Sequence, residues 1–302
     1  MYNRYVSEIN VIGGSCIDLL MKNVDEESFF SGRYKVESIK TSFGGDALNE
    51  SSVLRYFGKD VKLITIVGDD YYGDLIIDYL EHRDIPFYRN IRKKDSETYI
   101  SFVFIDKKGQ RKFAGNENGS LRIMDLDDIC IDEDCRYVSF ASLFLSKMLN
   151  NEKLSLLFEM IKAKGLTLFV DSSNHKNNET VDDMTCLKYV DYFFCNETEA
   201  SQLCESSDIS ECERKLYLAG IKNVVIKCGE KGCFYKGEYY PTEKIECIDS
   251  TGAGDSFAAG FIKAISENKN VSEAIKSANE FGTKACRYIG TTAWLEHTRK
   301  GL

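Results

Sequence analysis

The stretch "IDSTGAGDSFAAGF", residues 248–261, joins a turn of small residues to an apolar run. Gly252, Ala253 and Gly254 would weaken a strand and delay a helix, so a compensating use is expected for them. The residues that follow, "DSFAAGFIKAI", place apolar side chains at helical spacing. We therefore expect the small residues to lie at a helix N-terminus, where unpaired backbone N–H groups and the helix dipole attract anions.

Asp255 stands beside this expected anion site, although its carboxylate would repel a phosphate. That repulsion is understandable if Asp255 removes the proton from a hydroxyl group that attacks the phosphate. The alternative is an ordinary loop with Asp255 as helix N-cap, and taken alone the segment favours the cap. Familiar nucleotide motifs fit poorly: there is no G-x-x-x-x-G-K-[ST], and Phe257 stands where the dinucleotide fingerprint needs its third glycine.

Composition and charge bound the class of protein. The 302 residues are 43% hydrophobic and 29% charged, which is ordinary for a globular protein. A net charge of −9 argues against nonspecific binding to nucleic acid or to an anionic membrane. Because there is no long apolar run and no signal-peptide pattern, we expect a cytoplasmic location. The eleven cysteines form no C-x-x-C pair and have no histidine nearby to complete a zinc set, so free thiols are expected.

Short apolar runs alternate with segments of helical period along most of the chain. Two helices are expected over 46–57 and 71–83. Strands of this kind, alternating with helices, predict a parallel sheet covered on both faces, and we expect one α/β domain over 1–302. The expected strands are 8–14, 61–70, 137–141, 165–173, 190–196, 221–229 and 239–250.

Two segments depart from this pattern by alternating apolar with polar residues, over 31–43 and 97–114. The second carries "DKKGQ" between its halves, which is typical of a β-hairpin with glycine in the turn. Both segments could form a small antiparallel sheet that protrudes from the α/β body, or they could be edge strands of the main sheet. The pattern leaves both arrangements open.

Polar residues near the first strand and the first helix point to a ligand site. Asp18 comes just after the first strand, where open α/β sheets hold their ligands. Gly44 and Gly45 precede a helix that carries Asn49 on its first turn, an arrangement that suits hydrogen bonding to a polyhydroxylated ligand. The alternative is a glycine turn with Asp46 as the helix cap.

Two further segments follow later strands. "NETE" places Asn196 and Glu199 at a helix start, which is close to a capping box but could also order waters around magnesium. "IKCGEKG" places Gly229 and Gly232 after a strand, which suits backbone contact with a nucleotide or a simple hairpin.

Together these segments are similar to those of the ribokinase-like sugar kinases of the PfkB family. The resemblance rests on the order and spacing of "FGGDALNESSVLRYFG", "NETE", "IKCGEKG" and "DSTGAGDSFAAGF", and covers nearly the whole chain. It implies a three-layer α/β/α fold with a mostly parallel central sheet. It also implies a small β-sheet lid, formed by segments of about 15–43 and 96–116, that closes over the sugar and makes a homodimer contact.

The resemblance assigns a role to each matching residue. Asp255 becomes the general base that acts on the sugar hydroxyl, with ATP as the phosphoryl donor, and Gly252, Ala253 and Gly254 become the anion hole. Mg²⁺ is held through Glu199, by way of water or phosphate. The sugar site comprises Asp18, Gly44, Gly45, Asn49, Ser101 and Asn174, and the nucleotide site comprises Asn196, Lys227, Gly229, Gly232, Gly254 and Asn279.

Some members of the family also bind K⁺ beside the anion hole, and the matching positions here are Asp249 and Gly290.

The segment "DSSNHK" departs from the family, because Asn174 is shifted and His175 replaces an arginine, which favours a neutral sugar. Lid side chains are expected to set substrate choice, namely Tyr99, Ser101, Phe102 and Arg111.

The expected activity is thus phosphorylation of a hydroxyl group of a small sugar or sugar-like substrate, dependent on ATP and Mg²⁺. A nucleoside, a 2-keto-3-deoxy sugar acid or a phosphosugar stay open as acceptors. A catalytically silent sugar- or nucleotide-binding regulator is the alternative from another class, and the intact Asp255 weighs against it.

Overall fold

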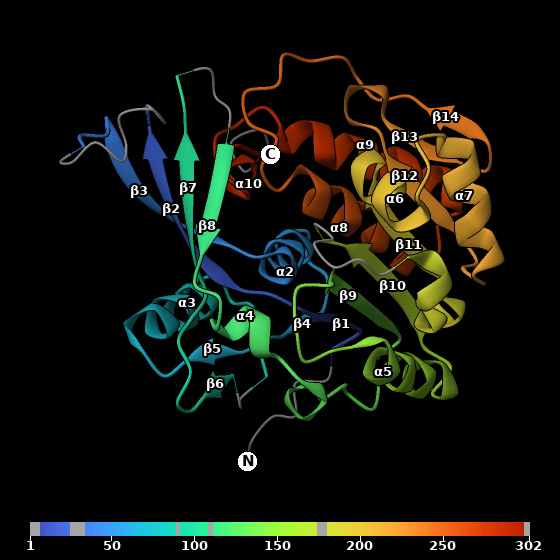
Figure 1. Cartoon of the computed structure of the whole chain (residues 1–302), viewed down its shortest axis with the longest axis horizontal. Coiled ribbons are helices and arrows are strands. Elements are labelled where there is room, and N and C mark those ends of the chain that lie inside the picture. Colours follow the sequence, from blue (N-terminus) through green and yellow to red (C-terminus); the bar gives the residue numbers. More distant parts are fainter. Residues whose placement is uncertain (1–6, 25–33, 89–90, 108–110, 174–179, 299–302) are drawn as a thin grey trace.

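A large and a small β-sheet organise the chain, and the small sheet stands away from the large one (Figure 1). The computed structural model describes residues 7–24, 34–88, 91–107, 111–173 and 180–298. The large sheet has eight strands in the order β14-β13-β12-β11-β10-β9-β1-β4. These strands are β1 (Ile9–Ile12), β4 (Val61–Ile64), β9 (Tyr137–Leu143), β10 (Thr167–Ser172), β11 (Tyr192–Asn196), β12 (Val224–Lys227), β13 (Cys233–Tyr235) and β14 (Glu238–Tyr240).

The strands from β4 to β12 run parallel, whereas β13 and β14 add to the edge in antiparallel fashion. The parallel strands are nearly continuous apolar runs because both faces of the sheet are covered. Successive side chains of a strand point to opposite faces of the sheet, and each face packs against its own buried apolar cluster. Phe193 therefore belongs to one cluster and Phe194 to the other. The structure confirms the expected mainly parallel sheet.

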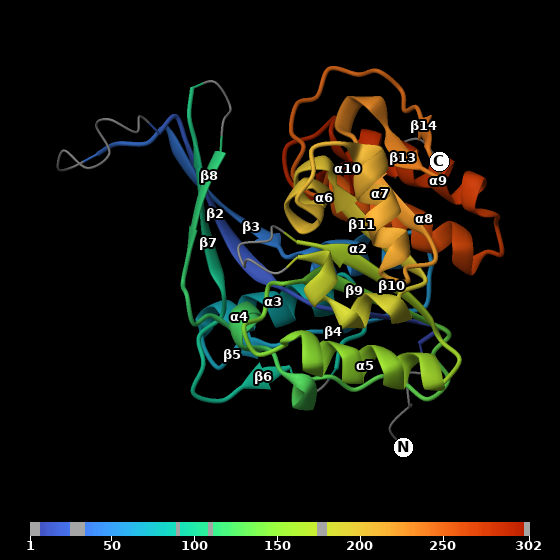
Figure 2. The same cartoon turned by 45° about the vertical axis from the view of Figure 1, so that its right-hand side comes forward.

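Helices cover both faces of this sheet (Figures 1 and 2). One layer contains α2 (Asp46–Tyr56), α8 (Ala253–Ser266) and α9 (Val271–Ala285), and the other contains α5 (Asn151–Ala163), α6 (Glu197–Cys204) and α7 (Ile209–Leu218). The helices expected near 46–57 and 71–83 are confirmed, each ending one residue earlier. The remaining elements are α3 (Tyr71–His82), α4 (Ser120–Ile123), α10 (Ala293–Thr298), the 3₁₀ turns η1 (Leu126–Asp128), η2 (Val181–Asp183), η3 (Thr185–Tyr189) and η4 (Gly229–Lys231), and the paired strands β5 (Val67–Gly68) and β6 (Arg92–Lys93).

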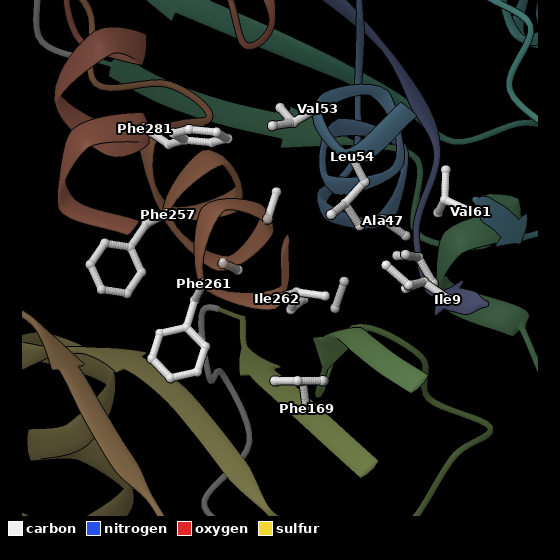
Figure 3. Packing of buried hydrophobic residues seen from close by; sticks show 14 of the residues in the cluster. Ile9, Ala47, Val53, Leu54, Val61, Phe169, Phe257, Phe261, Ile262 and Phe281 are labelled. Carbon is white, nitrogen blue, oxygen red and sulfur yellow. The ribbon is translucent and has the colours of Figure 1, made fainter. Parts of the chain in front are cut away.

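Helix α8 is held against the sheet by aromatic side chains. Phe261 is fully buried and meets the rings of Phe169, Tyr192 and Phe194 edge-on. Figure 3 shows Phe261 pointing toward the strands, with α2 alongside. This packing fixes the axis of α8 and therefore the position of its N-terminus, where the glycines of the opening stretch lie.

The strand expected over 239–250 is wrong beyond Tyr240. β14 ends at that residue, and 241–249 form an irregular segment. Pro241 supplies no backbone N–H for a ladder, which explains why the strand stops there.

The small sheet has the order β3-β2-β7-β8 and comprises β2 (Cys16–Lys22), β3 (Ser38–Gly44), β7 (Ile100–Ile105) and β8 (Arg111–Gly115). β2 and β3 pair antiparallel, as do β7 and β8. Within the described ranges none of these strands pairs with the large sheet, which excludes the edge-strand alternative. Residues 31–33 of the expected segment, and 108–110 of the expected hairpin turn, lie outside the described residues.

The expectation of a purely antiparallel small sheet is wrong at its centre, because β2 and β7 run parallel, with Asp18 opposite Ser101. Both strands leave the α/β body at the same place, where the amide of Ile17 donates to the carbonyl of Tyr99 at 3.1 Å. They therefore extend outward in the same direction.

The two faces of the small sheet differ in chemistry. The pairings place Asp18, Ser42, Ser101 and Arg111 on one face, which is called the polar face although it also carries Leu20, Val103, Ile105 and the exposed Phe113. They place a set of apolar side chains on the other face, namely Leu19, Met21, Ile39, Phe102 and Phe104. The polar face carries Asp18, Ser101 and Arg111, which the sequence assigns to the sugar, whereas Phe102 lies on the other face, so the expectation that Phe102 helps to set substrate choice is wrong.

Two expectations from composition can also be compared with the structure. In the part of the chain that is described, no helix combines the length and apolarity needed to cross a membrane. All eleven cysteines are free, and most are buried, where they act as small apolar residues.

We expect Phe261→Ala to lower the free energy of unfolding by about 3–5 kcal/mol, because it removes a fully buried aromatic side chain and leaves a cavity. The measurement is denaturant unfolding followed by circular dichroism. Leu218→Ala, at a side chain that is 75% exposed on α7, is the control and should change this free energy by less than about 0.5 kcal/mol. Equal effects from the two variants would contradict the packing described for α8.

Candidate active site

The start of α8 carries the backbone amides expected to bind an anion, although the amide of Ala253 already donates to the carbonyl of Ser250 at 3.2 Å. Gly252 is the N-cap residue, with φ 75°, and a Cβ there would lie 2.8 Å from Cα of Thr291. Glycine is therefore required for this close approach, and it has no side chain that could cap the helix. The amides of Gly254 and Asp255 lie in the first turn, where an α-helix offers them no acceptor. This end of α8 is suited to bind an anion.

A pocket of about 810 Å³ lies against this helix end and the carboxyl ends of β10, β11 and β12. It brings together residues that are far apart in the sequence, from Asp46 to Cys286. The residues expected at the nucleotide, metal and catalytic positions that line it are Asn196, Glu199, Lys227, Gly229, Gly232, Ala253, Gly254, Asp255 and Asn279.

Asp255 is not the N-cap of α8, so the alternative of a simple helix cap is wrong. Its Oδ2 accepts a hydrogen bond of 2.7 Å from Nδ2 of Asn49, which is 3% exposed on α2. Burial raises the pKa of Asp255 well above its usual range, and Asp46 and Asp171 add to this effect. The hydrogen bond from Asn49 and the charge of Lys227 act in the opposite direction. The result is a carboxylate with raised proton affinity.

The residues expected at the sugar, Asp18, Gly44, Gly45, Asn49 and Ser101, do not line this pocket, and the hydrogen bond from Asn49 connects them to Asp255. Asp18 and Ser101 are paired across β2 and β7, and Gly44 leaves space for the carboxylate, since a Cβ there would lie 2.1 Å from Oδ2 of Asp18. Burial raises the pKa of Asp18 to about 6, although Cys16 and Ser101 partly counter it. Gly45 is the N-cap of α2. Asn174 lies outside the described residues.

Asp46 reaches the pocket in a role that the sequence did not indicate. The alternative of Asp46 as a helix cap is wrong, because Gly45 occupies the N-cap position. Oδ2 of Asp46 instead accepts hydrogen bonds from Ser173 Oγ at 2.7 Å and Ser142 Oγ at 3.4 Å. Its side chain lines the pocket close enough to Asp255 to raise the pKa of that residue.

Lys227 and Asp171 form a buried ion pair beside the glycines. Nζ of Lys227 lies 2.7 Å from Oδ1 and 2.8 Å from Oδ2 of Asp171. Burial opposes the charge of Lys227, but Asp171 and Glu199 outweigh it and raise the pKa of the ammonium. A Cβ on Gly254 would lie 3.3 Å from this Nζ. The ammonium group thus lies next to the free amides of α8.

Asp171 was also missed by the sequence analysis. Burial raises its pKa to about 7 despite the attraction of Lys227. The available signal was an acidic residue at the end of the apolar run "LTLFVD", the position at which ligand-contacting residues occur in parallel sheets.

Asn196 and Glu199 form the capping box that the sequence indicated. Glu199 Oε2 accepts from the amide of Asn196 at 2.8 Å, and Asn196 Oδ1 accepts from the amide of Glu199 at 2.9 Å. Both side chains nevertheless line the pocket. Among the described residues, no three acidic, histidine or cysteine side chains converge on one point. This wall therefore fits Mg²⁺ that takes most of its ligands from phosphate and water, with Glu199 nearby.

Asn279 supports the opposite wall of the pocket. Its Nδ2 donates to the carbonyls of Tyr240 and Pro241 at 3.1 and 3.3 Å, and so holds the irregular segment after β14. Gly232 lies against the same segment.

Asp249, the residue expected to bind K⁺, is buried in a network of donors. Oδ1 accepts from the amide of Thr251 at 2.8 Å and forms an ion pair with Arg111 Nη2 at 2.6 Å. Oδ2 accepts from the amide of Gly290 at 2.9 Å. Burial opposes the charge on Asp249, but these donors outweigh it and lower its pKa.

Comparison with known proteins gives the same family as the motifs. Residues 7–298 match the pfkB family of carbohydrate kinases. The fructosamine kinase of Bacillus subtilis strain 168 is 23% identical, with 92% of this chain and 90% of that protein covered. The ribokinase of Staphylococcus aureus strain COL is 24% identical (92% and 92%), and the 2-dehydro-3-deoxygluconokinase of Escherichia coli K12 is 24% identical (94% and 96%).

Solved structures share the fold. A putative ribokinase II from E. coli in complex with ATP and Mg²⁺ matches with a TM-score of 0.80 and 21% identity, covering 98% of each chain. The Arabidopsis thaliana ribokinase complexed with ribose and ATP matches with a TM-score of 0.78 and 19% identity, covering 98% of each chain. The chain therefore belongs to the pfkB family of carbohydrate kinases, and it has their ribokinase fold.

Proposed function

We propose that the protein transfers the γ-phosphoryl group of ATP, with Mg²⁺, to a hydroxyl group of a small, neutral, sugar-like substrate. The observation that supports this most strongly is the position of Asp255. Its carboxylate contacts Asn49 on the side of the small sheet and belongs to the pocket that holds Lys227 and the free amides of α8 on the other side. One side chain therefore adjoins both an acceptor site and an anion site.

Asp255 would act as the general base. An acceptor hydroxyl bound beside Asn49 would pass its proton to the carboxylate while its oxygen attacks the phosphorus atom. Burial and the nearby Asp46 raise the proton affinity of Asp255, which suits a base that must take a proton from an alcohol. Asn49 holds the carboxylate in place, and its hydrogen bond acts to lower the pKa of Asp255.

The transferring group would be held by backbone and ammonium donors. The amides at the start of α8 and the ammonium group of Lys227 lie where negative charge develops, and Asp171 keeps Lys227 in position. Glu199 and Asn196 would hold Mg²⁺ through water and phosphate. When bound with ATP, Mg²⁺ supplies charge neutralisation on the phosphate oxygens.

The polar face of the small sheet supports a neutral acceptor. Asp18 and Ser101 offer groups that hydrogen-bond to hydroxyls, whereas the positive charge of Arg111 on that face is already paired with Asp249. The named relatives act on different sugars and sugar acids, so their names do not single out one acceptor. The acceptor must be identified by assaying a panel of compounds.

The apolar face of the small sheet supports a homodimer. Ile39 is 64% exposed and Phe102 is 38% exposed, and their strands place them on the face that points away from Asp18. A second copy of this chain, packed face to face on the same strands, would remove these side chains from water.

Replacing Asp255 by alanine should lower turnover by at least about 100-fold, the usual contribution of a general base, while the fold stays intact. The measurement is ADP release with Mg²⁺ across a panel of sugars, nucleosides and phosphosugars. Asp127→Ala, at an exposed aspartate, is the matched control and should behave like wild type. Comparable turnover in Asp255→Ala would disprove the base, and turnover with none of the acceptors would favour the binding regulator.

Replacing Asn49 should move the pH dependence of kcat/KM. The hydrogen bond from Asn49 lowers the pKa of Asp255, and the base is active only when ionised. Asn49→Ala therefore raises this pKa and shifts the acidic limb of the profile to higher pH. Asn49→Asp should shift it further, because a second carboxylate disfavours ionisation of the first. An acidic limb that stays in place in both variants would show that Asn49 does not act on the base.

Phe102→Asp should convert the homodimer into a monomer, because a charge would be buried in the apolar interface. Sedimentation equilibrium at micromolar concentration measures this mass. Met160→Asp, at an apolar side chain that is 52% exposed on α5, is the control and should keep the wild-type mass. A wild-type protein that sediments as a monomer would contradict the dimer.

A further inference from the structure

A cationic side chain from the small sheet reaches a buried carboxylate of the α/β body. Arg111, the first residue of β8, pairs through Nη2 with Oδ1 of Asp249 at 2.6 Å. The side chains are 20% and 1% exposed, so the pair is largely shielded from water. A shielded pair of this kind has a strong effect on the groups around it, because removal of one partner leaves an uncompensated charge.

Asp249 links the two loops that support the anion site. Its carboxylate accepts from the amide of Thr251, directly before Gly252, and from the amide of Gly290, directly before Thr291. Gly252 in turn packs against Thr291. The position of the first turn of α8 therefore depends on the carboxylate of Asp249, and Arg111 joins the amides of Thr251 and Gly290 in holding that carboxylate.

The resemblance to the family would place K⁺ at Asp249 and Gly290, but these residues do not fit K⁺ here. The negative charge of Asp249 is already balanced by the guanidinium group of Arg111. Each carboxylate oxygen already accepts hydrogen bonds from the protein, and Gly290 turns its N–H toward the carboxylate. A cation next to this carboxylate would meet positive groups on several sides.

We propose that the guanidinium group of Arg111 takes the place of the monovalent cation, so that this kinase works without K⁺. Arg111 acts as a positioning residue: its guanidinium group holds the carboxylate of Asp249 and thereby fixes the loops under the phosphate-binding amides. Because Arg111 belongs to β8, the charge is present at Asp249 only while the small sheet lies against the body. Closure over the acceptor and completion of the anion site are then one event.

A role of Arg111 in substrate contact is the competing interpretation, since its side chain lies on the same face as Asp18. The two roles differ in what replaces the lost group. A missing substrate contact is not restored by a salt, whereas a missing counter-ion is restored by a small cation that binds beside Asp249.

The first test uses thermal unfolding with K⁺ as the only ligand, so it needs neither nucleotide nor acceptor. Wild type should melt at the same temperature in KCl and in choline chloride of equal ionic strength. Arg111→Ala should melt at a lower temperature in choline chloride, and KCl should raise it by about 2 °C or more, because an ion that binds only the folded state stabilises it. Arg111→Lys keeps the charge and should resemble wild type. Lys112→Ala removes the neighbouring cation, whose side chain lies on the other face of β8, and should show no specific response to K⁺.

The second test measures turnover with the best acceptor of the panel, and it rests on the proposed function. Wild-type kcat should agree within about twofold in the two salts, whereas Arg111→Ala should lose on the order of tenfold in choline chloride, since the anion site is displaced. KCl or methylguanidinium chloride should restore much of this loss. A KM for the acceptor that changes without a change in kcat would support substrate contact instead and would overturn the proposal.

Two results of the melting experiment would also overturn the proposal that Arg111 replaces K⁺. One is a K⁺-specific rise in the melting temperature of wild type, and the other is the absence of such a rise in Arg111→Ala. The melting result is independent of any acceptor, so a failure to find one would count against the proposed function and leave the test of Arg111 intact.

Discussion

The ammonium group of Lys227 is the interaction on which the pocket depends. The carboxylates of Asp46, Asp171, Glu199 and Asp255 surround the pocket, and all four have raised pKa values because burial penalises their charge. Lys227 counters this penalty for each of them. β12 and β10 lie on either side of β11, and all three strands end at the same edge of the sheet. The long side chain of Lys227 at the end of β12 can therefore reach Asp171 at the end of β10.

The same arrangement explains how a pocket rich in acidic groups can accept phosphates under the proposed function. Free phosphates would be repelled by the carboxylates, and the local attraction comes from the amides of α8 and from Lys227. A divalent cation carried by the nucleotide would reverse the repulsion along the wall formed by Asn196 and Glu199. The acidic side chains would thus favour the metal complex of the nucleotide over the metal-free form.

Much of the fold follows from local patterns in the sequence. Apolar runs such as "YFFCN" and "VVIK" predict buried parallel strands, and the spacing around Phe257 and Phe261 predicts α8. The parallel pairing of β2 with β7 was not predictable in this way, since it depends on where the two strands leave the body. For the same reason, alternation alone could not decide between a separate sheet and edge strands.

The motifs named most of the residues of the nucleotide, metal and catalytic positions that line the pocket, but not what each of them contacts, and the residues expected at the sugar do not line it. Asn49 and Asp255 are far apart in sequence, and their hydrogen bond depends on how α2 packs beside α8. Asp46 and Asp171 have common structural uses, as a cap and at a strand end, so their spacing carried no distinct signal. The pair of Arg111 with Asp249 joins two elements whose relative position is set only by the completed fold.

The connection between the small sheet and the first helix has a consequence for proton transfer. β3 ends at Gly44 and α2 begins at Asp46, so a single glycine separates the sheet from the helix that carries Asn49. Gly45 also packs tightly, since a Cβ there would lie 2.4 Å from the carbonyl oxygen of Gly14. A displacement of β3 would therefore be felt at α2 and at the hydrogen bond from Asn49 to Asp255. The proton affinity of the base would then depend on the position of the small sheet.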